Sequence, residues 1–260
     1  MVAFRLVVIS CLIVCQTVSV FAQSDLPADR SVFTPSIGQL SPGVISGNLY
    51  TNDALGFRYQ FPAGWIVEDE ATQAKITEAG RQFVWGDNPS AAREHQLSQQ
   101  CERTLLSVTK YPQGTQAEGI QPLIAVMAFD SECSPITHFP ALSDDPQTIK
   151  GAIKQLAERF AGLLEGGPVT FRGDKFGKAF ALAGHLVLEI SASLGVKPPG
   201  SNLRRTVYTS LDFTEAKSYF VAWIFVSGSQ AELRELRNTG ISFNESSSIA
   251  SPPIPVSPSF

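Results

Sequence analysis

The segment Tyr219–Val226, YFVAWIFV, decides the expected fold, because its side chains are apolar on both faces of a strand. The odd-numbered residues, from Tyr219 to Phe225, form one face, and the even-numbered residues, from Phe220 to Val226, form the other. A strand with one face in water would alternate apolar with polar residues, so this strand needs cover on both faces. The run is also too short to span a bilayer. We therefore expect a central strand of a sheet that lies between two layers.

Both ends of the chain differ in composition from this segment. Residues 1–22 combine Arg5, an apolar run and small residues before Gln23, the pattern of a secretory signal peptide. An uncleaved membrane anchor is the alternative, although polar residues within the run make it a poor span. Residues 23–46 predict a flexible linker, and the Ser- and Pro-rich residues 244–260 predict a disordered tail. We expect an exported protein, periplasmic or extracellular, with one folded domain at 47–243.

The net charge of the chain excludes some classes of partner. The sequence has 20 basic and 24 acidic residues, and removing residues 1–22 takes away Arg5 and no acid, which leaves 19 against 24 and a net charge of −5. A mildly acidic protein lacks the basic surface that binds nucleic acid or anionic lipid. We expect the partner to be another protein or an envelope component. A membrane enters only if the N-terminal segment is retained.

Two cysteines, Cys101 and Cys133, remain once residues 1–22 are removed. Strands predicted at 103–111 and 122–130 flank a loop, and antiparallel pairing about residue 117 places the two cysteines opposite each other. In an oxidising compartment these thiols would form a disulfide that stabilises the fold by about 3–4 kcal/mol on the chain-entropy model. Two free thiols or a redox pair are the alternative, but a C-x-x-C motif is absent. We predict a structural disulfide.

Helix signals occur in two places between the predicted strands. Asp145-Pro146 begins a helix with apolar residues at spacings of four and three, and Ser229 with Glu232 forms a capping box for a second helix. Further strands are predicted at 57–61, at two places within 169–193 and at 203–213, and Ile241–Phe243 returns to the sheet. The expected fold class is α+β, an α/β/α sandwich whose central, mostly antiparallel sheet is covered by helices on both faces.

Motifs at the two ends of the predicted domain resemble a known superfamily. The first are YTNDALGF at Tyr50–Phe57 and FPAGW at Phe61–Trp65, and the last are SYFVAWIF at Ser218–Phe225 and ISF at Ile241–Phe243. Together they resemble the PsbP-like superfamily, which includes the extrinsic PsbP protein of photosystem II and a Ran-binding nuclear import factor. The resemblance covers about 47–243, but its specific motifs lie only at the ends. Residues 69–101 and the cysteine pair depart from the family pattern, and no family contact transfers to a named residue.

The residues that most often carry chemistry do not form a motif. His95, His138 and His185 lack the spacing of metal ligands, and a G-x-S-x-G elbow is absent. The segment 173–178 has the wrong glycine spacing for a phosphate loop and lacks its Ser or Thr. We therefore assign no catalytic, cofactor-binding or metal-binding residues and expect no cofactor.

Two candidate sites follow from these observations. A basic surface at one end of the sheet would meet an acidic partner through Arg172, Lys175, Lys178, Arg204 and Arg205. A dispersed hydrolase site on the polar strand faces would use His185, Glu189, Tyr208 and Asp212. The first hypothesis is an exported, non-enzymatic binding or assembly module. The alternatives are an exported hydrolase and, if residues 6–22 are not removed, a membrane-tethered envelope protein.

Overall fold

The computed structural model describes a large part of the predicted domain. The described residues are 36–75, 101–112, 120–130, 139–163, 169–172, 177–196, 205–217, 219–238 and 240–244. The predicted signal peptide, most of the predicted linker and residues 245–260 lie outside them. In the described part of the chain, no helix is both long and apolar enough to cross a membrane.

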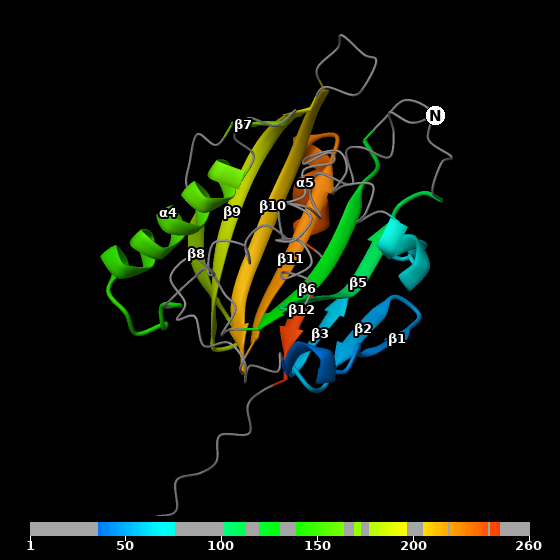
Figure 1. Ribbon diagram of the computed structural model, residues 1–260, viewed down its shortest axis with the longest axis horizontal. Helices are drawn as coiled ribbons and strands as arrows, with labels where there is room; N and C mark the ends of the chain where they lie inside the picture. The colour runs from blue at the N-terminus through cyan, green and yellow to red at the C-terminus, as the bar shows by residue number, and fades with distance from the viewer. Residues whose placement is uncertain are drawn as a thin grey trace, which may run out of the picture.

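The larger of two antiparallel sheets holds the segment that the sequence places at its centre (Figure 1). Its strands follow the spatial order β4 (Ile66–Val67), β5 (Glu102–Thr109), β6 (Leu123–Asp130), β11 (Tyr219–Ser227), β10 (Arg205–Ala216), β9 (His185–Val196) and β7 (Val169–Arg172), and β8 (Lys178–Leu182) also pairs with β9. Trp223 and Phe220 of β11 are both buried, and they belong to cores on opposite faces of the sheet. The prediction of a central strand that is covered on both faces is confirmed.

The smaller sheet covers part of one face of the larger sheet. Its order is β1 (Val44–Ser46), β2 (Leu49–Asn52), β3 (Phe57–Gln60) and β12 (Ile241–Phe243). Phe57 and Phe243 place their rings 5.1 Å and 6.0 Å from the ring of Trp223, in edge-to-face contact. We call the core between the two sheets the small-sheet core. Ile241–Phe243 therefore returns to the smaller sheet, because its strand pairs with β3.

The helices cover less of the larger sheet than the sequence predicts. The helix α4 (Pro146–Leu163) buries Ile153 and Leu156 in the core on one face, over β8 and β9 (Figure 1). The helix α5 (Gln230–Arg237) adds Leu233 and Leu236 to the small-sheet core on the other face. On that face a second sheet shares the cover, so the predicted sandwich with helices on both faces is not confirmed. The fold is a mixed α+β fold built mainly from two sheets.

Both helices begin where the sequence predicts. The Asp145 carboxylate accepts hydrogen bonds from the backbone N–H groups of Gln147 and Thr148, at 2.8 Å and 3.1 Å. Ser229 is the N-cap of α5 and accepts a hydrogen bond from the N–H of Glu232 at 3.2 Å. The N–H of Ser229 donates to the hydroxyl of Ser227 at 3.0 Å instead of to Glu232. Only one half of the predicted capping box therefore forms.

The register of β5 and β6 differs from the prediction. The N–H of Asp130 donates to the carbonyl of Cys101 at 2.9 Å, so Cys101 lies opposite Asp130 and not opposite position 133. Near the loop, Thr109 pairs with Leu123, which is already two positions from the predicted register, and a β-bulge between Thr104 and Leu106 adds one residue to β5 and shifts the pairing by one more. The predicted register is wrong. Cys133 lies outside the described residues, so its disulfide with Cys101 stays a prediction.

Two further segments differ from the sequence-based expectation. The region 169–193 contains three strands rather than two, because Ala183 and Gly184 adopt positive φ angles of 46° and 83° and form a tight turn between β8 and β9. Residues 36–46, which the sequence assigns to the flexible linker, form the 3-10 helix η2 (Ser36–Gln39) and β1. Ile37 and Leu40 are buried in the small-sheet core. Ordered packing therefore begins before residue 47.

Candidate functional site

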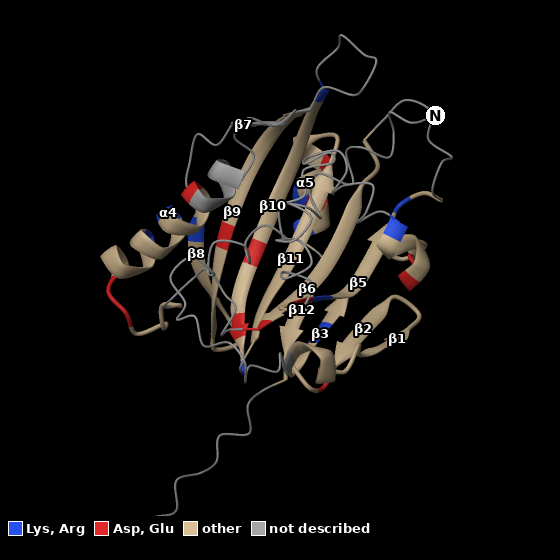
Figure 2. Ribbon diagram, viewed as in Figure 1, with Lys and Arg blue, Asp and Glu red and all other residues tan. Residues whose placement is uncertain are grey.

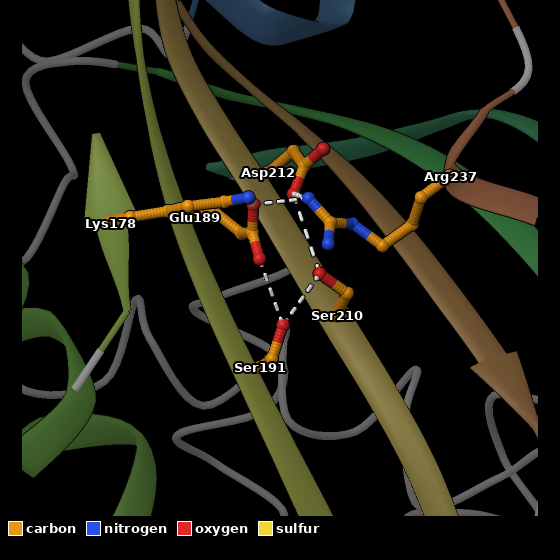
Figure 3. Close-up of polar contacts among 6 residues, drawn as sticks. All are labelled: Lys178, Glu189, Ser191, Ser210, Asp212 and Arg237. Carbon is orange, nitrogen blue, oxygen red and sulfur yellow. Dashed lines mark hydrogen bonds and ion pairs between the residues drawn. The ribbon is translucent and has the colours of Figure 1, made fainter. Parts of the chain in front are cut away.

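A group of charged and polar side chains lies on the face of the larger sheet that meets α5. Figure 2 shows acidic positions side by side on the neighbouring strands β9 and β10. The group, which we call the charge cluster, consists of Lys178, Glu189, Ser191, Ser210, Asp212 and Arg237 (Figure 3).

Strand register brings the members of the charge cluster together. Asp212 of β10 pairs directly with Glu189 of β9, and Ser210 pairs with Ser191. Lys178 of β8 pairs with Glu189 from the other side. Gly177 permits this approach, because a Cβ atom there would lie 1.9 Å from the carbonyl oxygen of Glu189. Three strands and the last turn of α5 thus contribute to one site.

Glu189 is the most strongly paired member of the charge cluster. Its Oε2 contacts Arg237 Nη2 and lies 3.2 Å from Lys178 Nζ, while its Oε1 accepts a hydrogen bond from the hydroxyl of Ser191 at 3.1 Å. The Glu189 side chain is 6% exposed, whereas Lys178 is 63% exposed and Arg237 is 21% exposed. The two cations therefore close the site from its solvent side, and the carboxylate lies beneath them.

The negative charge of Asp212 is balanced much less well by its neighbours than that of Glu189. Its Oδ1 lies 3.8 Å from Arg237 Nη2, the nitrogen already bound to Glu189, and accepts a hydrogen bond from Ser210 at 3.4 Å. Burial raises the pKa of Asp212 to about 6. The positive charge of Arg237 lowers this pKa, but the nearby negative charge of Glu189 opposes that effect. Ser191 and Ser210, 3.2 Å apart, link the two carboxylates through their hydroxyls. The cluster therefore holds two buried carboxylates side by side, joined by a pair of hydroxyl groups.

The hydrolase site predicted from the sequence is only partly assembled. Glu189 and Asp212 meet in the charge cluster, but Tyr208 lies four residues before Asp212 along β10, about 13 Å away. His185 is half-buried, with Nδ1 3.2 Å from the carbonyl oxygen of Glu215 and its ring stacked on Phe243. The imidazole therefore lies apart from the serine hydroxyls that a nucleophilic mechanism would have to activate.

The cations of the predicted basic surface do not meet where they are described. Lys178 lies opposite Glu189 and Arg205 lies opposite Val196, which separates their backbones by seven residues along β9, about 23 Å. Arg172 is described only by its backbone in β7, and Lys175 and Arg204 lie outside the described residues. Lys178 also has an ion-pair partner, Glu189. The surface as a whole stays a prediction.

Sequence reasoning missed Arg237, Ser191 and Ser210 as members of the site. Arg237 is a basic residue in the last turn of a helix, a common and unspecific position. A usable signal lies in the strands themselves. Each strand carries a carboxylate and a serine two residues apart, in segments whose alternate positions are apolar. Two such strands adjacent in the chain predict a polar row on one face of a hairpin.

Within the described part of the chain, no group of three or more His, Cys, Asp or Glu side chains could hold a metal ion. No protein-family model and no curated protein matches the chain.

Several solved structures are similar to this chain, and they include the following three proteins. The cyanobacterial PsbP protein, CyanoP, of Synechocystis sp. PCC 6803 is 13% identical, covers 77% of this chain and 95% of its own, and has a TM-score of 0.41. LpqN of Mycobacterium tuberculosis, described as involved in cell envelope biogenesis, is 15% identical over 72% of this chain and 83% of its own, with a TM-score of 0.34. A protein of unknown function, PA94 of Pseudomonas aeruginosa, is 12% identical over 47% of this chain and 68% of its own, with a TM-score of 0.29.

The likeness to a PsbP protein that the sequence motifs indicate is thus found again among solved structures. At these identities and TM-scores the similarity carries no conclusion about activity or partners.

Proposed function

We propose that this protein is an exported, non-enzymatic binding module and that its partner docks on the β1–β2 hairpin. The observation that carries the proposal is the exposure of large apolar side chains there. Val44 is 69% exposed, Ile45 41% and Leu49 36%, and these are three of the five exposed large apolar residues in the described part of the chain. Exposed apolar residues that gather in one place mark interaction sites, whereas scattered ones need no explanation.

The position of the hairpin supports this proposal. β1 is the end strand of the smaller sheet and pairs only with β2 among the described strands. Val44 and Leu49 share the outer face of the hairpin, since Val44 pairs with Thr51 and Leu49 pairs with Ser46, whereas Ile45 pairs with Tyr50 and lies on the opposite face. An end strand offers unpaired backbone groups beside this apolar surface, and the two together suit a protein partner that adds an extended segment.

The hairpin is also held firmly from beneath. Tyr50 is buried, and its hydroxyl donates to the carbonyl of Pro42 at 2.8 Å. The amide of Asn52 donates to the carbonyl of Ser41 at 2.9 Å and to the Tyr50 hydroxyl at 3.0 Å. Gly43 packs so closely that a Cβ atom would lie 2.6 Å from that hydroxyl. A surface that is already ordered loses less conformational entropy on binding, which favours its use as a docking site.

The state of the charge cluster supports a non-enzymatic role. Its carboxylates and serine hydroxyls are bonded to one another, and the imidazole of His185 lies elsewhere. A hydrolase would need a hydroxyl within hydrogen-bond reach of an oriented base and of bound substrate. Here the hydroxyls of Ser191 and Ser210 serve the carboxylates of the same cluster.

Site-specific photo-crosslinking in cell envelopes tests the proposed docking surface. A photo-reactive residue at Leu49 of the full chain should crosslink one specific protein, whereas the same residue at Leu142, which is 44% exposed far along the chain, should not. The substitution Val44→Glu should remove the Leu49 product, while the control Val67→Glu on β4 should leave it unchanged. Equal products from positions 49 and 142, or none from either, would contradict the proposal.

The state of the cysteines tests the export part of the proposal separately. If the chain reaches an oxidising compartment, Cys101 and Cys133 should resist alkylation until a reductant is added, and the purified protein should begin near Gln23. Intact mass after alkylation with and without reductant, together with N-terminal sequencing, measures both. Two freely alkylated thiols in protein isolated from the envelope would contradict the predicted disulfide. A retained residue 1 would favour the membrane-anchored alternative.

A further inference from the structure

The charge cluster joins parts of the fold that are separate in sequence. Arg237 belongs to the last turn of α5, whereas Glu189 and Asp212 belong to the larger sheet. The chain leaves α5 and enters β12 within four residues, and β12 pairs with β3 of the smaller sheet. Contacts between Arg237 and the two carboxylates therefore hold α5 to the larger sheet at the point where the chain crosses to the smaller one.

A single guanidinium nitrogen of Arg237 forms ion pairs with both carboxylates. Arg237 Nη2 binds Glu189 Oε2 and lies 3.8 Å from Asp212 Oδ1. Lys178 Nζ, the other cation of the cluster, approaches Glu189, at 3.2 Å. The side chains of Glu189 and Asp212 are only 6% and 5% exposed and lie directly opposite each other on paired strands. Two buried carboxylates so placed repel each other when both are ionised.

The groups around Asp212 balance its negative charge poorly, so binding a proton is the simplest way to stabilise this buried carboxyl group. The charged groups that face it are Lys178 from β8, Glu189 from β9 and Arg237 from α5. Ser210 of its own strand gives a hydrogen bond at 3.4 Å, and on β11 it pairs with Trp223, which carries no charge. A protonated Asp212 would remove the repulsion with Glu189 and could donate a hydrogen bond of its own. Arg237 would then pair with Glu189 alone.

We propose that Glu189, Asp212 and Arg237 form an acid-strengthened clamp that holds α5 against the larger sheet more tightly at mildly acidic pH than at neutral pH. The clamp is independent of the docking surface on the β1–β2 hairpin, so either proposal can fail without the other.

The direction of the pH effect follows from the linkage of proton binding to folding. The pKa of Asp212 is about 6 in the folded protein against an ordinary value of 3.8, so the folded state binds the proton more tightly than an opened state does. The folded state therefore gains stability as the pH falls through 6, and this gain is complete below the ordinary value. Between pH 7.5 and pH 5.0, the opening equilibrium of α5 should fall by about tenfold.

Hydrogen exchange on the full mature chain tests the clamp without any substitution. After correction for intrinsic exchange rates, the protection of the amides of α5 should rise about tenfold from pH 7.5 to pH 5.0, while that of α4, which lies on the opposite face, should change much less. An equal change in both helices, or none in α5, would overturn the proposal.

A substitution gives a second, independent test. Asp212→Asn supplies a neutral side chain of the same shape at every pH, so the variant should gain little or no protection in α5 between pH 7.5 and pH 5.0. At pH 7.5 its α5 should be at least as protected as that of the wild type. A variant that keeps the wild-type pH dependence would overturn the proposal. If the variant does not fold, a carboxyl NMR titration of the wild type decides, since a midpoint below 4.5 for Asp212 would overturn it equally.

Discussion

Replacing Trp223 by alanine is expected to lower the free energy of unfolding by about 3–5 kcal/mol, the largest loss that any single substitution in the two cores should cause. The indole lies at the centre of the small-sheet core, where Phe57 and Phe243 of the smaller sheet contact it edge to face. Its removal leaves a cavity between the two sheets, which neither sheet can fill without moving. Denaturant unfolding followed by circular dichroism measures the change.

Two other substitutions serve as controls for this prediction. Trp223→Phe keeps most of the apolar contact and removes an indole N–H that has no hydrogen-bond partner among the described residues, so it should cost much less than the alanine variant. Trp65→Ala removes the same side chain from a half-buried position at the edge of the small-sheet core and should also cost less. A Trp65→Ala loss equal to that of Trp223→Ala would show that the core is not centred on Trp223.

Replacing Arg237 by methionine is expected to cost about 3 kcal/mol at pH 8. Methionine keeps much of the apolar volume but removes the cation that binds Glu189 and approaches Asp212, and it leaves two buried carboxylates facing each other. We place the effect at the lower end of the range for broken buried ion pairs because Arg237 is about one-fifth exposed. Denaturant unfolding of the wild type and the variant at the same ionic strength measures it.

Arg234 provides the matched control for this second prediction. It lies in the same helix but is exposed, so Arg234→Met should change stability by no more than a few tenths of a kcal/mol. Adding Glu189→Gln and Asp212→Asn to Arg237→Met should restore much of the loss, because the repelling charges are then gone. Failure of that rescue would show that Arg237 stabilises α5 by packing and not by its charge. The loss should also be smaller at pH 5, where protons can replace the missing cation.

Local features of the fold were predictable because the forces behind them act within a few residues. The N-caps of α4 and α5, at Asp145 and Ser229, depend on side chains that bond to N–H groups two or three positions away. The alternation of Phe57 and Tyr59 with Arg58 and Gln60 likewise reports a strand with one buried face. The same reasoning could not predict whether a helix or a second sheet covers each face, because both present similar apolar surfaces.

The register of strands was less accessible to sequence reasoning. A pairing about residue 117 looks symmetric in the sequence, but the strands pair two positions away from that register, and the bulge between Thr104 and Leu106 adds one more residue to β5 alone. No local sequence pattern in either strand predicts that bulge. The candidate site shows the same limit, since Glu189 and Asp212 were selected for their polar strand faces but were grouped with His185 and Tyr208, which lie about 13 Å away along the strands.

The central strand and its need for cover on both faces could be predicted from the amino-acid sequence alone, since a run of apolar residues at successive positions cannot leave either face in water. The starts of α4 and α5 could be predicted in the same way. The sharing of the cover by a second sheet, and the contact of Arg237 with Glu189 and Asp212 from a distant helix, became evident only from the folded chain. Both features depend on contacts between residues far apart in the chain, and local sequence patterns do not predict the energies of such contacts.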